Sequence, residues 1–282
     1  MTRIIAAADG SLTLKGFTAG AEYEVTATEV KPAPEGSVLW YGSFESGNID
    51  KTLFPYSNFV AGHVTVVPDP AGSGQKVLRF AIPDSDRPYS GATAPRGDVE
   101  SPPFFHPGNE VFVGTQTLLP IGSGFPTSAG GWFQVSEIYG KPYGGSPTIG
   151  QDLIHDSAGW HYCLQRDATH GYDKPWVGPV LDGKWHQVIF HVRFATNNTG
   201  FVEVYYDGVL QKFSNGSTRL YYITLQKGID WDGTDGNFLN TNSYRQAEAY
   251  PGTDAVSRCS GGRYVACGRE KQAESPMMRV NS

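Results

Sequence analysis

Short segments in which polar and apolar residues alternate recur from residue 37 to the end of the chain, separated by glycine and proline. Strict alternation predicts a β-strand with one face in a core, and glycine and proline mark the turns between strands. No stretch shows the period of an α-helix. The segments with the clearest alternation are residues 77–82, 110–119, 131–139, 185–194 and 200–206.

These segments predict an all-β protein with two stacked antiparallel sheets of the jelly-roll type. Asp207-Gly208 follows one of them directly and predicts a two-residue hairpin turn. Only 18% of the 282 residues are charged, which fits many short strands joined by tight turns. Because residues 37–282 show no further boundary and no fixed repeat, we expect them to form one domain.

Residues 1–36 are expected to form a separate unit. Residues 11–16 and 23–28 alternate on either side of a Gly-Ala break, which predicts a hairpin, and residues 31–36 form a proline-containing linker. A lone hairpin is only marginally stable in water, so this one must dock on something. Packing on the main domain and anchoring to a larger assembly both stay open.

Charge and hydropathy exclude two classes of partner. The net charge of −6 gives no attraction for nucleic acid or for an anionic membrane. No apolar run reaches the ~18 residues that a membrane crossing needs. We therefore expect neither partner. The first ten residues are also too short in apolar length for a secretory signal.

The cysteines and histidines predict no metal centre. Cys163, Cys259 and Cys267 have no repeated spacing, so buried free thiols are favoured, although Cys259 and Cys267 could pair. The histidines lack metal-ligand spacing, and His186 and His191 lie in an apolar strand that suggests a structural role. No cofactor is expected, while a structural calcium ion at a loop stays open.

The first of three polar strand faces lies in residues 96–100. Arg96, Asp98 and Glu100 are two apart and so project from one face. A guanidinium flanked by carboxylates can orient sugar hydroxyls and hold a uronate carboxylate. A solvated edge strand with a salt bridge would show the same pattern.

The second polar face lies in residues 132–139. In a regular strand Gln134 and Ser136 share one face with Trp132, and Glu137 and Tyr139 share the other, but a β-bulge would change this. Glu137 beside Tyr139 places a proton acceptor next to a phenol, which suits proton transfer. A tyrosine at a strand end beside a partly exposed glutamate is the alternative.

The third polar face lies in residues 237–246. Asn240, Asn242 and Tyr244 alternate with smaller or apolar residues, and two amides and a phenol on one face suit hydrogen bonds to sugars. Arg245 follows directly and is a further candidate binding residue. Exposed aromatic rings could add stacking platforms for sugar rings, although burial in the core is the alternative for each. The candidates are Trp176, Tyr143, Tyr172 and Trp160.

These segments, in this order, resemble those of the jelly-roll polysaccharide lyases, which include alginate, glucuronan and heparin lyases. Arg96-Gly-Asp98 resembles the family's Arg-x-Glu strand, and Glu137-Ile-Tyr139 resembles its Gln-Ile-His strand. Residues 240–246 resemble its late strand with the catalytic tyrosine. Residues 40–48 and 176–186 resemble landmarks of the fold. The resemblance covers roughly residues 37–270 and implies a concanavalin A-like sandwich.

The resemblance implies β-elimination on a polysaccharide, in which a base removes the C5 proton of a uronate and an acid protonates the departing oxygen. It makes Tyr244 the acid, or both acid and base, and gives Arg96 and Asn240 the substrate carboxylate. Three departures stand out. Tyr139 replaces a histidine and Glu137 replaces a glutamine, and a carboxylate at position 137 would repel a uronate. Asparagine or threonine also replaces the lysine of the late strand.

Three functions follow as hypotheses: a lyase on an acidic polysaccharide, a non-catalytic glycan-binding module that keeps the groove, and a hydrolase that pairs Glu137 with Asp98 or Glu100. A polysaccharide partner implies an extracellular site of action. A virion surface, such as a phage tail with residues 1–36 as its anchor, fits the lack of a secretory signal. A trimmed bacterial secreted enzyme is the alternative.

Overall fold

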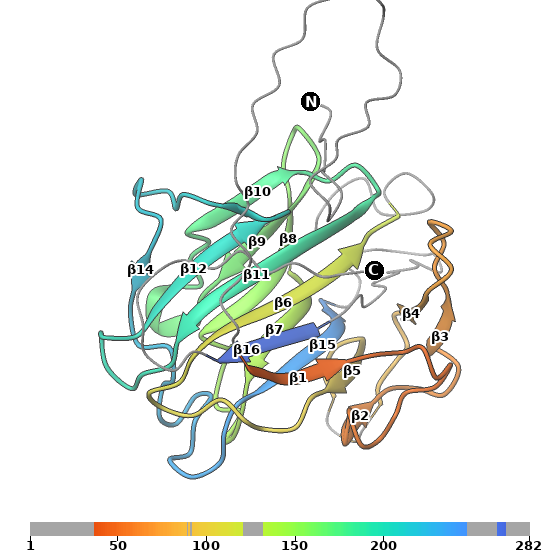
Figure 1. Cartoon of the computed structure of the whole chain (residues 1–282), viewed down its shortest axis with the longest axis horizontal. Coiled ribbons are helices and arrows are strands. Elements are labelled where there is room, and N and C mark those ends of the chain that lie inside the picture. The colour runs from red at the N-terminus through yellow and green to blue at the C-terminus, as the bar shows by residue number, and fades with distance from the viewer. Residues whose placement is uncertain (1–36, 89, 91, 121–131, 247–263, 269–282) are drawn as a thin grey trace, which may run out of the picture. The chain divides into compact units, whose positions relative to one another are not determined.

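The computed structural model describes residues 37–88, 90, 92–120, 132–246 and 264–268. The expected hairpin unit and linker at residues 1–36 lie outside the described residues, and so does Cys259. Within the described segments nearly all regular structure is antiparallel β-strand, which confirms the all-β prediction (Figure 1). The helical element found there is a single 3-10 turn, η1 (Ala168–His170).

In the described part of the chain, one sheet has seven strands. Its order is β1-β16-β6-β11-β12-β13, and β14 also pairs with β12. The strands are β1 (Ser37–Gly42), β6 (Glu110–Leu118), β11 (Trp185–Arg193), β12 (Phe201–Tyr206), β13 (Val209–Leu210), β14 (Leu220–Tyr221) and β16 (Tyr264–Gly268).

A second sheet, also seven-stranded within the described residues, has the order β10-β9-β8-β7-β15-β5-β2, and a separate pair is formed by β3 and β4. The strands of the second sheet are β2 (Tyr56–Asn58), β5 (Arg96–Glu100), β7 (Phe133–Tyr139), β8 (Ile149–His155), β9 (Trp160–Gln165), β10 (Trp176–Val180) and β15 (Phe238–Arg245). The separate pair consists of β3 (Val64–Pro68) and β4 (Lys76–Phe80).

The two large sheets stack with one apolar core between them, as Figure 1 shows for β6 and β11 in front of β7 and β8. Hydrogen bonds also cross the interface. Thr115 on β6 donates to Gln151 Oε1 on β8 at 2.8 Å, and Thr117 donates to the Tyr162 hydroxyl on β9 at 2.5 Å. Buried donors and acceptors cost free energy unless they are paired, so these bonds fix how the sheets face each other. The jelly-roll sandwich is confirmed.

The predicted strands at residues 77–82, 110–119, 131–139, 185–194 and 200–206 correspond to β4, β6, β7, β11 and β12. Asp207 and Gly208 have φ angles of 48° and 79° and join β12 to β13. Two positive φ angles are what a type I′ hairpin turn requires, so the predicted turn is confirmed.

Candidate functional site

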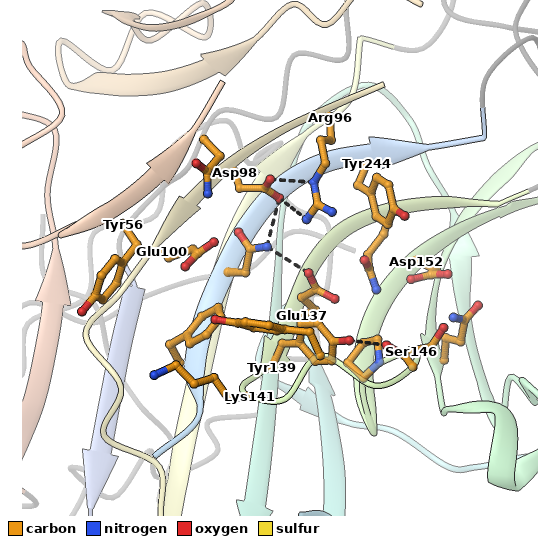
Figure 2. A pocket seen from close by; sticks show the side chains of 18 of the residues that line it. Tyr56, Arg96, Asp98, Glu100, Glu137, Tyr139, Lys141, Ser146, Asp152 and Tyr244 are labelled. Carbon is orange, nitrogen blue, oxygen red and sulfur yellow. Dashed lines mark hydrogen bonds and ion pairs between the residues drawn. The ribbon is translucent and has the colours of Figure 1, made fainter. Parts of the chain in front are cut away.

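A groove of 1220 Å³ opens on the face of the second sheet that points away from the core. Its floor crosses β5, β15, β7, β8 and β9, which are neighbours in that order. Figure 2 shows charged and aromatic side chains from these strands converging in it. Because side chains alternate along each strand, one set of residues points to the core and the other set to the groove.

Strand β5 contributes an arginine clamped by a carboxylate. Arg96 donates from Nε to Asp98 Oδ2 at 2.7 Å and from Nη2 to Asp98 Oδ1 at 2.9 Å. Asp98 is only 1% exposed, while Arg96 and Glu100 reach the groove on the same face. A two-point ion pair fixes the plane of the guanidinium, so Arg96 has a defined position.

Strand β7 contains the bulge that the sequence left open. Gln134 pairs with Asp152 on β8, but Ser136 pairs with Gln151, so two residues of β7 face one step of β8. Ser136 therefore turns to the core and donates to Gln151 Oε1 at 2.9 Å. As a result Gln134 and Glu137 both line the groove, together with Tyr139.

Strand β15 carries two amides that converge on Glu137. Asn240 Nδ2 donates to Asp98 Oδ1 at 3.0 Å and to Glu137 Oε1 at 2.9 Å (Figure 2). Asn242 Nδ2 donates to the same Oε1 at 3.2 Å and is fully buried beneath the floor. Asn240 thus joins the carboxyl groups of β5 and β7 in one hydrogen-bonded cluster.

Tyr244 lies against both a cation and an indole. It is the cross-strand partner of Arg96, whose Cζ lies 4.2 Å from the centroid of the Tyr244 ring. The Trp132 ring meets the Tyr244 ring edge-on, with 4.4 Å between centroids. A cation this close stabilises negative charge on the phenol oxygen when its proton leaves.

The acidic groups of the groove outnumber the one guanidinium among them. Burial is the main cause that raises the pKa of Glu137 to about 7; Arg96 and the Asn240 amide lower it and Asp98 raises it. Burial, followed by the charges of Asp98 and Glu137, raises the pKa of Glu100 to about 8. The single charge of Arg96 cannot offset the carboxyl groups of Asp98, Glu100 and Glu137. Glu137 and Glu100 therefore stay protonated at pH values where an exposed glutamate would be ionised.

Tyr139 is held as a neutral donor. Its hydroxyl donates to the backbone oxygen of Gly145. Burial, and next the charge of Glu137, raises the pKa of Tyr139 above its ordinary value. Of the two tyrosines in the groove floor, Tyr244 is therefore the one whose surroundings suit proton exchange.

The structure does not bring Arg245 and Trp176 to the groove. Arg245 is 1% exposed and points to the opposite face of β15, where it pairs with Asp84 and donates to the Ile82 carbonyl at 3.1 Å. Trp176 is 2% exposed and belongs to the core between the sheets, as does Trp160. Arg245 follows Tyr244 directly, so strand alternation turns it to the opposite face. Trp176 is buried because its large apolar indole packs in the core.

Several groove residues lie on elements that the sequence patterns above did not single out. Asp152 and Gln165 line the groove from β8 and β9, and Lys174 reaches it from the loop before β10. Alternation in Ile149-Gly-Gln-Asp-Leu-Ile-His could have found Asp152, but Gln151 on the core side obscures it. Tyr172, named above only as a stacking platform, also lines the groove.

The described segments place no histidine in the groove. They hold no group of three or more His, Cys, Asp or Glu side chains that could bind a metal ion. All seven histidines lie in these segments, and none lines the groove. Cys163 is buried with a free thiol, as expected. The described residues form no helix with the length and apolarity of a membrane span.

A family model described as "Polysaccharide lyase" matches residues 37–231. A comparison with curated protein sequences gives no match. Among solved structures, the endo-β-1,4-glucuronan lyase of Trichoderma reesei is similar with a TM-score of 0.55 and 16% identity, over 82% of this chain and 95% of that one. A GH131 β-glucanase catalytic domain from Podospora anserina has a TM-score of 0.52 and 14% identity, over 86% and 98%. At these identities the likeness concerns the fold.

Proposed function

This chain belongs to the polysaccharide lyase family, and we propose that it cleaves an acidic polysaccharide by β-elimination in the groove of the second sheet. The observation that carries the proposal is the placement of Arg96 across Tyr244, with Asp98, Asn240 and Glu137 hydrogen-bonded beside them. These residues come from three neighbouring strands and meet on one groove floor. The reaction needs a binding position for the substrate carboxylate next to a phenol that can exchange a proton.

In the proposed reaction the substrate carboxylate lies against Arg96 and Glu137. A guanidinium can hold a carboxylate through parallel N–H donors. Both asparagine amides donate to Glu137 Oε1, so the proton of a neutral Glu137 resides on Oε2. A protonated carboxyl group donates a hydrogen bond to a uronate, as the amide of glutamine would. The replacement of glutamine by Glu137 is then compatible with an acidic substrate.

Charge neutralisation at the carboxylate acidifies the C5–H bond. The deprotonated oxygen of Tyr244 accepts the C5 proton, a C4–C5 double bond forms, and the C4–O bond breaks. The same proton then passes from Tyr244 to the departing oxygen, which balances the reaction. Arg96 holds the phenol in place and stabilises its negative charge during the exchange.

A single acid–base residue restricts the sugar. One oxygen can serve C5 and O4 only if both lie on the same face of the ring. This holds for 1,4-linked D-glucuronate and D-mannuronate, whereas in galacturonate and guluronate the two groups are on opposite faces. Since no histidine lines the groove to act from the other side, we favour the first two sugars.

The orphaned oxygen of Asn240 also supports a sugar ligand. Asn240 Oδ1 is buried and has no hydrogen-bond donor among the described residues. A buried acceptor without a partner is costly, and a sugar hydroxyl would supply the missing donor. The place of action that fits such a substrate is the cell surface or the medium. The virion hypothesis depends on residues 1–36, which lie outside the described residues.

The test is to digest a panel of uronate polymers and neutral glucans while following two signals. Elimination gives an ultraviolet absorbance rise from the conjugated double bond together with new reducing ends. New reducing ends without absorbance would replace the proposal by hydrolysis with Glu137 and a second carboxyl group. Saturable binding without either signal would leave a non-catalytic glycan-binding module.

A further inference from the structure

We propose that Asp152, Gln165, Tyr172 and Lys174 form a second subsite, which binds the sugar unit next to the one at Tyr244 and favours a unit with an acidic substituent. This inference rests on the proposed function, because it seats a neighbouring unit of the same polysaccharide. Asp152 and Gln165 lie on β8 and β9, beyond Glu137 on the side away from β5, and Tyr172 and Lys174 lie in the segment between β9 and β10. Figure 2 shows Asp152 on one side of Glu137 and Glu100 with Tyr56 on the other.

The strand order makes the subsite continuous with the proposed reaction centre. Gly150 on β8 is the direct cross-strand partner of Glu137 on β7 and of Gln165 on β9. A Cβ atom at Gly150 would lie 3.0 Å from Gln134 Nε2, so a side chain there would crowd the floor. With strands about 4.8 Å apart, the floor from β5 to β9 extends for about 19 Å, long enough for more than one sugar unit.

Asp152 provides an unsatisfied acceptor in this part of the groove. It is 2% exposed, yet Oδ1 has no hydrogen-bond partner in the described part of the chain. Burial raises the pKa of Asp152 to about 8; the Lys174 ammonium lowers it, the charge of Glu137 raises it, and a hydrogen bond with Gln134 lowers it. A buried carboxyl oxygen left unpaired costs free energy, and a sugar hydroxyl would satisfy it.

Tyr172 is presented to the groove by a strained and braced loop. It is 51% exposed and has a φ of 54°, a conformation that non-glycine residues seldom adopt. Arg166 Nε binds Asp173 Oδ1 at 2.7 Å, and the Tyr172 amide donates to the Asp167 carbonyl at 3.0 Å. Strain of this kind persists where the surroundings enforce it, often at a ligand site.

Positive φ angles at non-glycine residues are concentrated along this groove. Among the described residues they occur at Tyr143, Tyr172 and Asp207. Asp207 belongs to a hairpin turn that requires the conformation, but both tyrosines line the groove with exposed rings. An exposed ring held in place offers a flat apolar face to a pyranose.

Lys174 gives the subsite its preference for charge. It is exposed, lines the groove and acts electrostatically on Asp152. None of the ion pairs found among the described residues involves Lys174, whereas the groove's other lysine, Lys141, pairs with Asp235 at 2.7 Å. An ammonium group in this position attracts a carboxylate or sulfate on the second sugar unit.

The experiment measures affinity against chain length in the Tyr244→Phe protein, which prevents turnover. Calorimetric titrations use 1,4-linked glucuronate oligosaccharides of two to six units, with cello-oligosaccharides as neutral probes. We expect affinity for the glucuronate series to rise with chain length. Asp152→Asn and Tyr172→Ala should each lower the affinity for the longer oligosaccharides by about tenfold. Lys174→Gln should lower the gain in affinity with length for the glucuronate series and leave the affinity for the cello-oligosaccharides unchanged.

Matched controls are Lys212→Gln and Tyr221→Ala, which alter an exposed lysine and an exposed tyrosine that do not line the groove. If wild type cleaves the oligosaccharides but all three subsite variants keep the full gain with length, the subsite is refuted and the proposed function stands. If no oligosaccharide binds and wild type cleaves none, the function and the subsite are both refuted. Equal loss in the control variants would also overturn the assignment.

Discussion

Arg96 lies with its guanidinium carbon 4.2 Å from the ring centroid of Tyr244, its direct partner across two neighbouring strands. The same guanidinium is held by both carboxylate oxygens of Asp98. Because Asp98 is buried, the guanidinium does not depend on an exposed side chain for its position. A cation already held next to a phenol stabilises the charge that develops on the phenol oxygen without any rearrangement of the site.

Replacement of Tyr244 by phenylalanine tests the proton-exchange role. Tyr244→Phe keeps the ring between Arg96 and Trp132 but removes the hydroxyl, so we expect cleavage to fall by about 10²–10⁴-fold. Binding of glucuronate oligosaccharides should persist. The measurement is kcat from the ultraviolet assay, with Tyr221→Phe as the control. Retention of more than a tenth of the wild-type kcat would move the role to another residue.

Replacement of Arg96 by lysine separates geometry from charge. Lysine keeps the positive charge but cannot bind Asp98 through two parallel hydrogen bonds or lie flat on Tyr244. We expect Arg96→Lys to lower kcat/KM by about 100-fold, a loss of roughly 2.7 kcal/mol in transition-state stabilisation.

The chain contains a matched control for this variant. Arg219 also lies over an aromatic ring, with Cζ 4.0 Å from the Phe201 centroid, and pairs with Glu203, but it does not line the groove. Arg219→Lys should cost stability without changing kcat/KM. A similar loss of activity in both variants would indicate a general effect on the fold.

The pH dependence of cleavage should report the protonation of Glu137. Its pKa is raised to about 7, so the neutral form predominates below that pH and is lost above it. Glu137→Gln keeps a neutral donor at every pH. The ratio of kcat/KM for the variant to that for wild type should therefore rise about tenfold per pH unit above pH 7.

This ratio is compared between about pH 5 and pH 9 at constant ionic strength. Below pH 6 the variant should retain activity close to wild type, because the two side chains then offer similar hydrogen bonds. A variant that is inactive at every pH would mean that the ionised carboxylate of Glu137 is required, and would favour hydrolysis.

Asp152→Asn should stabilise the fold at alkaline pH. The folded-state pKa of Asp152 is raised to about 8 from an ordinary 3.8, so the unfolded chain binds fewer protons between these values and stability falls as pH rises through them. Asparagine removes this cost. Thermal unfolding should show a higher Tm for the variant at pH 8, by roughly 2–6 °C, and no gain at pH 4. A Tm that is equal or lower at pH 8 would contradict the burial argument.

Residues with strict alternation were the most predictable from sequence. Arg96, Asp98 and Glu100 share one face of β5, and Asn240, Asn242 and Tyr244 share one face of β15, because these two strands pair with each other without a register shift over that stretch. Gln134 needed the bulge in β7 to join Glu137, and nothing in the local residue types fixes where an extra residue enters a strand. The sequence thus predicted which strands carry the polar floor of the groove, but not the register between them.

Two further groups of residues depended on tertiary context. The indole of Trp176 suits both a sugar platform and a core, and only the packing of β10 against the other sheet decides for the core. Asp152 and Lys174 lie outside the segments that resemble the family's motifs. Their place in the groove follows from the order β10-β9-β8-β7, which single strand patterns do not contain.

The most direct test of the central claim is the mass of the products released from a 1,4-linked glucuronate polymer by the wild-type chain. Elimination at the Tyr244 centre predicts oligosaccharides with an unsaturated non-reducing end, each lighter by one water than the corresponding hydrolysis product, and none from Tyr244→Phe. Products with the mass of hydrolysis, or products formed equally by Tyr244→Phe, would contradict it.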